Sequence, residues 1–207
     1  MPGRRDRKKE EARQRLYKAA IHLFITKGYE STSVQEITDL ADMAKATFFN
    51  YFPTKEHVLA AFHNEMTESI LKTLTSRSYS SPTQAVMSAM GVFADWAEKS
   101  VSIGRILLRV VFGSDVLANS DQENEKKFYQ WFEDQIRSAV STGEMDSALD
   151  ISLFTSLILA VLSSTAQEWF ITEQSFDLKP ALEMRIAYLV KSASVQRQSF
   201  GVVKKNK

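Results

Sequence analysis

The first part of the chain has apolar residues spaced as in an amphipathic helix. Leu16, Ala19–Ala20 and Leu23–Phe24 follow the i, i+3, i+4, i+7, i+8 pattern, which buries one side of a helix. Lys27 and Gly28 then place a cation in the last turn and, just beyond it, a residue that adopts a positive φ without strain. The pattern predicts a helix that ends at Gly28.

Two short helices are predicted next. Ser33 and Glu36 have the spacing of a capping box, so we expect a helix that begins at Val34. Another begins at about Lys45 and ends before Pro53, because a proline moves the preceding residue out of the α region. This order of helix, tight turn and helix is typical of a pair whose second helix enters the DNA major groove. Such pairs also occur in protein cores, so the spacing alone does not establish DNA binding.

The rest of the chain is also predicted to be helical. Thr54 can cap a helix of roughly five turns. Residues 76–82 follow without periodicity and break the pattern. Further helical patterns lie at 83–99, 103–117, 121–142, 150–171 and 180–195. We therefore expect an all-α fold.

The composition supports a helical, soluble protein. Hydrophobic residues make up 44% of the 207, and the 7 Gly and 4 Pro are few for the turns that a sheet needs. The chain has no cysteine, which excludes disulfides, thiolate metal sites and cysteine nucleophiles and is compatible with a reducing cytoplasm. Thr155 and Ser156 interrupt the longest apolar stretch, so we expect a cytoplasmic protein that does not enter a membrane.

The charges are nearly balanced overall but uneven along the chain. With 26 Lys and Arg against 25 Asp and Glu, any affinity for nucleic acid must come from where the charges lie. The first fifteen residues carry an excess of basic side chains, which suits a flexible arm along phosphates and equally a solvated tail. These side chains are Arg4, Arg5, Arg7, Lys8, Lys9, Arg13 and Arg15.

The second short helix has an unusual outer face. If Phe48 and Phe52 point inward, the remaining positions combine a cation, an amide, a phenol and small side chains. These outward positions are Lys45, Ala46, Thr47, Asn50 and Tyr51. That mixture suits contacts with phosphates and base edges.

Residues 16–59 resemble the DNA-binding domain of the TetR (tetracycline-repressor) family. The resemblance is carried by Ala19-Ala20, Leu23-Phe24, Gly28-Tyr29, Thr32-Ser33-Val34, Glu36-Ile37, Ala41, Lys45, Thr47-Phe48, Tyr51-Phe52-Pro53 and Lys55-Glu56. It covers about a quarter of the chain, and the later helices match the family in number, order and length alone. The resemblance implies a homodimeric, ligand-responsive repressor that binds a near-palindromic double-stranded operator. It is not an enzyme and needs no cofactor or metal.

The resemblance also implies three regions. We expect a helix-turn-helix domain at 1–54, an effector-binding and dimerisation domain at 55–200 whose residues 55–76 form a connector helix, and a basic tail at 201–207. The expected DNA-binding residues are Ser33, Gln35, Lys45, Ala46, Thr47, Phe49, Asn50, Tyr51 and Lys55. Asn50 would discriminate most between sequences, and Lys55 would hold a phosphate at a helix N-terminus. Capping alone also accounts for Ser33, and a lysine in solvent for Lys55.

Three positions depart from the family pattern. Asp42 replaces the usual Gly, and Asp tolerates the left-handed conformation of such a turn. Ala44 replaces a small polar cap, which removes about 1 kcal/mol of helix stabilisation. Phe49 replaces a tyrosine whose hydroxyl could reach a phosphate. We expect an intact fold with altered backbone contacts.

The later helices are rich in large apolar residues. Most of these must be core, but an aromatic cavity with a few polar groups is the usual ligand site of a helical bundle. Candidate effector-binding residues are Phe93, Trp96, Arg105, Leu108, Arg109, Phe112, Phe128, Trp131, Phe132, Phe154, Gln167 and Trp169. They favour an apolar or amphipathic effector of unknown identity.

A dimer interface is predicted on the last two helices. The helix at 150–171 is apolar over too wide an arc for a surface helix, and its small residues allow another helix to approach. Candidate interface residues are Leu157, Ala160, Val161, Ser164, Ile186, Leu189 and Val190. With its symmetry mate this pair would form a four-helix bundle.

Two other functions compete with a repressor. An enzyme is disfavoured because the chain has three His, no Cys, and none of the H-E-x-x-H, G-x-S-x-G or phosphate-binding glycine motifs. A helical carrier or interaction module would use the same cavity without touching DNA. Salt-dependent binding to promoter DNA distinguishes the repressor from the carrier.

Overall fold

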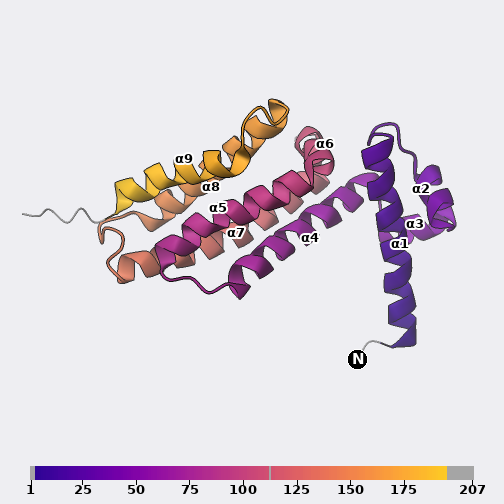
Figure 1. Ribbon diagram of the computed structural model, residues 1–207. Helices are drawn as coiled ribbons and strands as arrows, with labels where there is room; N and C mark the ends of the chain where they lie inside the picture. Colours follow the sequence, from indigo (N-terminus) through magenta and orange to yellow (C-terminus); the bar gives the residue numbers. More distant parts are fainter. Residues whose placement is uncertain (1–2, 112, 195–207) are drawn as a thin grey trace, which may run out of the picture.

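The computed structural model describes residues 3–111 and 113–194. Within these ranges the chain forms nine α-helices. They are α1 (Arg4–Thr26), α2 (Val34–Ala41), α3 (Lys45–Tyr51), α4 (Lys55–Ser76), α5 (Pro82–Lys99), α6 (Val101–Val111), α7 (Asp115–Ser141), α8 (Ile151–Ile171) and α9 (Leu178–Ala193). Figure 1 shows α1, α2 and α3 together at one end and α4 running from them into a bundle with α5, α7, α8 and α9. The predicted all-α fold is confirmed.

The capping box predicted at the start of α2 is present. The Glu36 N–H donates to Ser33 Oγ at 3.2 Å, and the Ser33 N–H donates to Glu36 Oε2 at 2.9 Å. At the other end of α2, Asp42 adopts φ 53° and ψ 56°, the left-handed conformation expected of it. Ala44 precedes α3 without a side-chain cap, also as predicted.

Two sequence-based expectations about the helices were wrong. The N-terminal basic segment is not a flexible arm, because α1 begins at Arg4 and its first turns are helical and exposed. The helix predicted at 103–117 ends at Val111, and α7 begins at Asp115 instead of 121. Ser114 causes this early start, since its Oγ accepts the Leu117 N–H at 3.4 Å.

The buried side chains form two cores that share α4. The N-terminal core contains Leu16, Tyr17, Ala19, Ala20, Phe24, Tyr29, Ile37, Ala41, Phe48, Phe52, Val58, Leu59, Ala60, Ile103 and Leu117. The bundle core begins with Ile70 and Leu74 and continues through α5, α7, α8 and α9. The first half of α4 therefore packs with α1–α3 and its second half packs in the bundle, as a connector helix requires.

Helix α8 is the one described helix that is long and apolar enough to cross a membrane by length and composition. It lies in the bundle against α7 and α9, with Phe154 and Ile158 buried in the bundle core. A core helix of a soluble protein passes the same test, so this feature is weak evidence for a membrane segment.

Candidate nucleic-acid interface and ligand cavity

The outer side of α3 carries both polar and apolar exposed residues and is supported by buried phenylalanines. Phe48 is 0% exposed and Phe52 2% exposed, both within the N-terminal core. We define the recognition face as Lys45, Ala46, Phe49 and Asn50, which are all exposed. The predicted contact residues Thr47 and Tyr51 flank it and are half-buried. The burial of the two phenylalanines fixes which side of α3 faces solvent.

The turn before α3 is held by α1. Arg15 Nη2 donates to the backbone carbonyl of Ala41 at 2.6 Å, which caps the last turn of α2. The same nitrogen lies 3.8 Å from Asp42 Oδ2. A cation therefore offsets the carboxylate that this chain places in its helix-turn-helix, where it would otherwise repel phosphates.

The predicted phosphate ligand Lys55 has partners inside the domain. Its Nζ donates to the backbone carbonyls of Tyr29 at 2.9 Å and Thr32 at 2.8 Å, and it lies 4.5 Å from the centre of the Tyr29 ring. The alternative of a lysine free in solvent is therefore wrong. Since an ammonium group has three N–H donors, one is left to contact a phosphate, and that contact remains a prediction.

Neighbouring hydrogen bonds fix the same corner. Tyr29 Oη donates to Glu56 Oε1 at 2.8 Å. Burial, together with the hydrogen bond to Glu56, raises the pKa of Tyr29 above its usual range. Burial would raise the pKa of Glu56, but hydrogen bonds from Thr54, its own N–H and Tyr29 outweigh it and lower this pKa. The start of α4 is thus bonded to the loop between α1 and α2.

The start of α2 presents the other two predicted contacts. Ser33 and Gln35 are exposed, but the Ser33 side chain caps the helix and Gln35 Nε2 donates to Asp39 Oδ1 at 2.7 Å. Glu36, which completes the cap, forms an ion pair with Lys27. The hydrogen bond from Lys27, followed by those from Ser33, lowers the pKa of Glu36 to about 2. Capping fully accounts for Ser33, so its contact with DNA remains a prediction.

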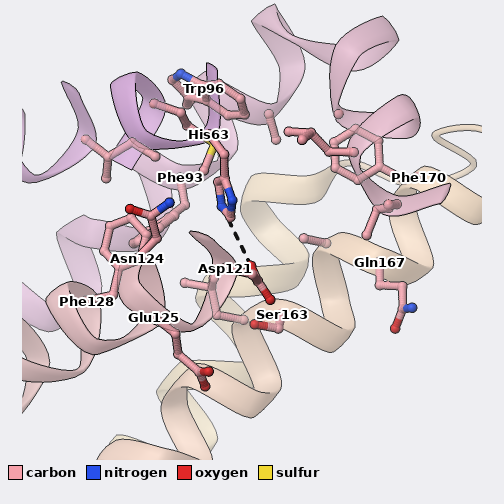
Figure 2. Close-up of a pocket in the computed structure, with 18 of the residues that line it drawn as sticks. His63, Phe93, Trp96, Asp121, Asn124, Glu125, Phe128, Ser163, Gln167 and Phe170 are labelled. Carbon is pink, nitrogen blue, oxygen red and sulfur yellow. Dashed lines mark ion pairs between the residues drawn. The ribbon is translucent and has the colours of Figure 1, made fainter. Parts of the chain in front are cut away.

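A cavity of about 360 Å³ lies in the second part of the molecule, between α4, α5, α6, α7, α8 and α9. Five of the residues predicted for the effector line it: Phe93, Trp96, Leu108, Phe128 and Gln167. Figure 2 shows the aromatic side chains around this space together with several polar groups. The volume falls within the range of small-molecule sites.

Six other predicted effector residues do not line the cavity. The rings of Trp131, Phe132, Phe154 and Trp169 are buried in the bundle core, because they lie on other faces of their helices. Arg105 instead donates from Nη2 to Gln174 Oε1 at 3.2 Å, and Arg109 is exposed. These six predictions are corrected. Phe112 lies outside the described residues.

The structure adds polar residues that the sequence did not suggest. His63, Asp121, Asn124 and Glu125 line the cavity, as does Phe170. His63 Nε2 lies 3.7 Å from Asp121 Oδ1, and Figure 2 shows the imidazole pointing toward that carboxylate. Burial lowers the pKa of His63, and the Asp121 charge opposes this without reversing it.

Helical spacing was the available signal for these residues. His63 stands three residues before Met66 and seven before Ile70, which places all three on one face of a helix. Asp121 and Phe128, which are seven residues apart on α7, share a face in the same way.

Helix α6 separates the cavity from the DNA-binding region. Leu107 and Val111 line the cavity and also pack against the N-terminal core. Gly104 lies against α8 so closely that a Cβ there would be 2.5 Å from Phe170 Cζ. A ligand that displaces Phe170 or α6 would therefore press on the core that supports α3.

The last two helices leave an apolar surface exposed. Leu157 is 42% exposed, Met184 57% and Tyr188 72%. Of the predicted interface residues, Leu157, Ala160 and Ser164 are exposed and Val161 and Leu189 half-buried. The two others, Ile186 and Val190, are corrected, because they are buried within the chain against its own bundle. The exposed apolar side of α9 is the opposite one, which carries Met184 and Tyr188.

Comparison with known proteins agrees with both halves of this description. Residues 16–62 match the family model of bacterial regulatory proteins of the tetR family. The HTH-type transcriptional regulator TcmR of Streptomyces glaucescens is 35% identical over 89 residues, which cover 42% of this chain and 39% of TcmR. The match therefore spans well under half of that relative.

Solved structures extend the likeness to the whole fold. A TetR transcription regulator from Haloarcula marismortui has a TM-score of 0.76 at 13% identity, covering 90% of this chain and 100% of that one. Thermus thermophilus FadR, a TetR-family transcriptional repressor solved with lauroyl-CoA, has a TM-score of 0.71 at 20% identity and covers 90% of this chain and 97% of that one. Residues 16–62 thus resemble the tetR family of bacterial regulatory proteins, and the described helices share the fold of these solved structures.

Proposed function

We propose that this protein is a homodimeric transcription repressor that leaves its DNA operator when a small apolar or amphipathic effector enters the cavity. The observation that carries the proposal is the recognition face of α3, which holds polar side chains in solvent above the buried Phe48 and Phe52. A polar helix face with this support is what a major-groove contact needs. The names of the relatives describe regulators, in keeping with a protein that is not an enzyme.

The contacts with DNA divide into two kinds. Asn50 presents an amide, which pairs with the edge of an adenine, and Lys45 presents an ammonium for a phosphate or a guanine. Thr47, Tyr51 and the third N–H of Lys55 would contact the phosphate backbone. Affinity would then come largely from phosphates and would fall steeply with salt.

The N-terminal turns of α1 extend this surface. They carry Arg4, Arg5, Lys8 and Lys9 in an exposed helix at the same end of the molecule as α3. A helical basic segment suits phosphates as well as the flexible arm that the sequence suggested. Its contribution would be independent of DNA sequence.

The exposed side of α8 and α9 would join two copies of the chain. Leu157, Met184 and Tyr188 form an apolar surface that is costly to leave in water, and Ala160 and Ser164 allow a helix to approach closely. A two-fold axis there gives an isologous four-helix interface. The two recognition helices then need to meet half-sites about 34–36 Å apart, or multiples of that spacing.

Effector binding would act through α4 and α6. Both helices line the cavity, with His63 and Leu107, and both pack into the N-terminal core, with Leu59 and Ile103. An occupant that favours another position of these helices changes the separation of the recognition helices in the dimer. The effector must bind the released arrangement more tightly than the DNA-bound one.

We also propose a division of the chain into regions, which the two cores support in part. The helix-turn-helix region at 1–54 and the effector and dimer region at 55–200, with the connector at 55–76, fit the packing of α1–α3 and of α5–α9. Helices α4, α6 and α7 cross this division, because each also places side chains in the N-terminal core, among them Leu59, Ile103 and Leu117. The tail at 201–207 lies outside the described residues. A cytoplasmic location goes with a function on DNA.

A binding titration tests the proposal. Labelled DNA from the neighbourhood of the gene is titrated with the protein at several salt concentrations, and fluorescence anisotropy gives the affinity. Lys45→Ala should weaken binding and lower the salt slope by about 2, since each of the two protomers loses one phosphate contact. Lys72→Ala is the matched control, because Lys72 is an exposed lysine on α4 far along the connector. Binding that is absent, or insensitive to salt, would favour a carrier instead.

A further inference from the structure

The charged groups that line the cavity are carboxylates. Asp121 and Glu125 reach it from α7, and no lysine or arginine is among its lining residues within the described part of the chain. His63 is the third titratable group, and burial lowers the pKa of its imidazole, so it adds no positive charge at neutral pH. Of the polar residues that the sequence suggests for this cavity, which are Arg105, Arg109 and Gln167, Gln167 alone lines it.

The rest of the wall is suited to a positive charge as well. Phe93, Trp96, Phe128 and Phe170 line the cavity, and aromatic faces attract cations. Phe93 and Phe128 lie edge to face with their ring centres 4.9 Å apart. In Figure 2 Trp96 and the Asp121 carboxylate lie on opposite sides of His63. A ligand beside His63 would thus meet a ring and a carboxylate together.

One buried amide adds a hydrogen-bond acceptor. Asn124 lines the cavity and is 1% exposed, and its Nδ2 donates to Asn64 Oδ1 at 2.8 Å. Its Oδ1 has no hydrogen-bond partner among the described residues. A buried acceptor without a donor is costly, so a ligand with an N–H group that reaches it would be favoured over one that offers acceptors alone.

We propose that the cavity binds a lipophilic cation, an apolar body that carries an ammonium or similar N–H-bearing positive group near Asp121 and Glu125. The proposal rests on the function proposed above, in which this cavity is the effector site, and it names the class of effector. A positive group beside the two carboxylates gains them as counter-charges and keeps part of its hydration, because the Asp121 side chain is 58% exposed. An anionic head group there would be repelled by the same carboxylates and would gain no cationic partner from the wall.

Three ligands that share the same alkyl chain but differ in head-group charge separate the effect of charge from that of hydrophobicity. Dodecylamine, which is cationic at pH 7.5, dodecanol and dodecanoate are titrated into the protein below their micellar concentrations and followed by calorimetry. Dodecylamine should bind at least about tenfold more tightly than dodecanol, and dodecanoate least tightly, since tenfold corresponds to about 1.4 kcal/mol. Equal affinities for the three, or tighter binding of dodecanoate or lauroyl-CoA, would overturn the proposal.

Neutral variants test the two carboxylates. Asp121→Asn and Glu125→Gln should each weaken the binding of dodecylamine about fivefold and change the affinity for dodecanol by less than about twofold. The expected effect is modest because each carboxylate is exposed to solvent, which screens its charge. Glu123→Gln is the matched control, because Glu123 is an exposed carboxylate on α7 that does not line the cavity. Loss of both ligands to the same extent would mean that the carboxylates act on the fold and not on the charge of the ligand, which contradicts the proposal.

The same ligands added to the complex with DNA distinguish the two proposals. Release of DNA by dodecylamine supports both. Release of DNA by dodecanoate alone would support the proposal of a ligand-responsive repressor. It would overturn the proposal that the effector is a cation. Tight binding of dodecylamine without any change in DNA affinity supports a cation site and contradicts its role as the effector site.

Discussion

The DNA-binding region and the ligand cavity use opposite arrangements of polar and apolar residues. In the first, the candidate contacts are exposed or half-buried while Phe48 and Phe52 are buried, all within residues 33–55. In the second, aromatic side chains surround an internal space, and the polar groups reach it from separate helices such as α4 and α7. A local surface is specified by spacing along one helix, whereas a cavity is specified by which faces of distant helices meet.

The largest expected effect comes from the support of α3. Phe48→Ala should destabilise the protein by about 3–5 kcal/mol, because a fully buried ring leaves a cavity in the N-terminal core. Chemical denaturation measures the change. Phe49→Ala is the adjacent control, since Phe49 is 45% exposed and should change stability by less than about 1 kcal/mol. Equal losses of unfolding free energy for the two variants would contradict the burial of Phe48 and the exposure of Phe49.

The next effect concerns the apolar surface of α8. Leu157→Asp should weaken the dimer at least about a hundredfold, because two symmetry-related carboxylates would be buried in one interface. Sedimentation velocity over a range of concentrations gives the dissociation constant. Ile25→Asp is the control, since Ile25 is an exposed apolar residue on α1. A dimer that survives Leu157→Asp unchanged would place the interface elsewhere.

Asn50 tests specificity without testing the fold. Asn50→Ala should reduce discrimination between the best DNA site and a single-base variant by about 1–3 kcal/mol, while thermal stability stays the same, because the side chain is exposed. Competition titrations measure the discrimination. Should the variant lose affinity equally for all sequences, Asn50 would be a backbone contact and not a base contact.

Gly104 tests the link between the two regions. Gly104→Ala places a methyl group 2.5 Å from Phe170 Cζ, so the ring or α6 must move. We expect a stability loss of about 1–3 kcal/mol and a changed ligand affinity, with an altered DNA affinity as the sign of coupling. Calorimetry and anisotropy on one preparation measure both. Altered ligand binding with DNA affinity unchanged would show that α6 does not transmit the signal.

The smallest effect is a pH dependence from the cap of α2. The pKa of Glu36 is lowered from 4.5 to about 2, so its stabilising contribution is present above pH 4.5 and is lost as the pH falls toward 2. Glu36→Gln should flatten the stability curve in that window and change it little at pH 7 beyond the loss of the ion pair with Lys27. Denaturation midpoints between pH 2 and 6 would show it. A variant with the same curve as the parent protein would contradict the assigned cause.

The difference between the two regions explains which predictions succeeded. The capping box at Ser33, the left-handed Asp42 and the end of α3 before Pro53 depend on neighbours in the chain, and all three are confirmed. The resemblance to the TetR family, which rested on the same segment, is also confirmed. Local sequence was sufficient there because each of these features depends on residues at most four positions apart.

The cavity could be predicted only in part. Phe93, Trp96 and Phe128 are predicted because the later helices carry more large apolar residues than one buried helix face requires. All three line the cavity. The rings of Trp131 and Trp169 were chosen by the same reasoning, yet they pack in the core, since composition does not tell which side of a helix meets the space. The prediction of interface residues failed in the same way at Ile186 and Val190. Both lie on the face of α9 that packs against the chain's own bundle.

The central claim is that α3 reads DNA sequence in duplicate, once from each half of a symmetric dimer. Selection from a random pool of double-stranded DNA tests it most directly, because no operator has to be known. The account predicts enrichment of an inverted repeat whose half-sites lie whole helical turns apart, and a relaxed preference in that repeat for Asn50→Ala. A pool that is not enriched, or that yields a single unrepeated half-site, would contradict it.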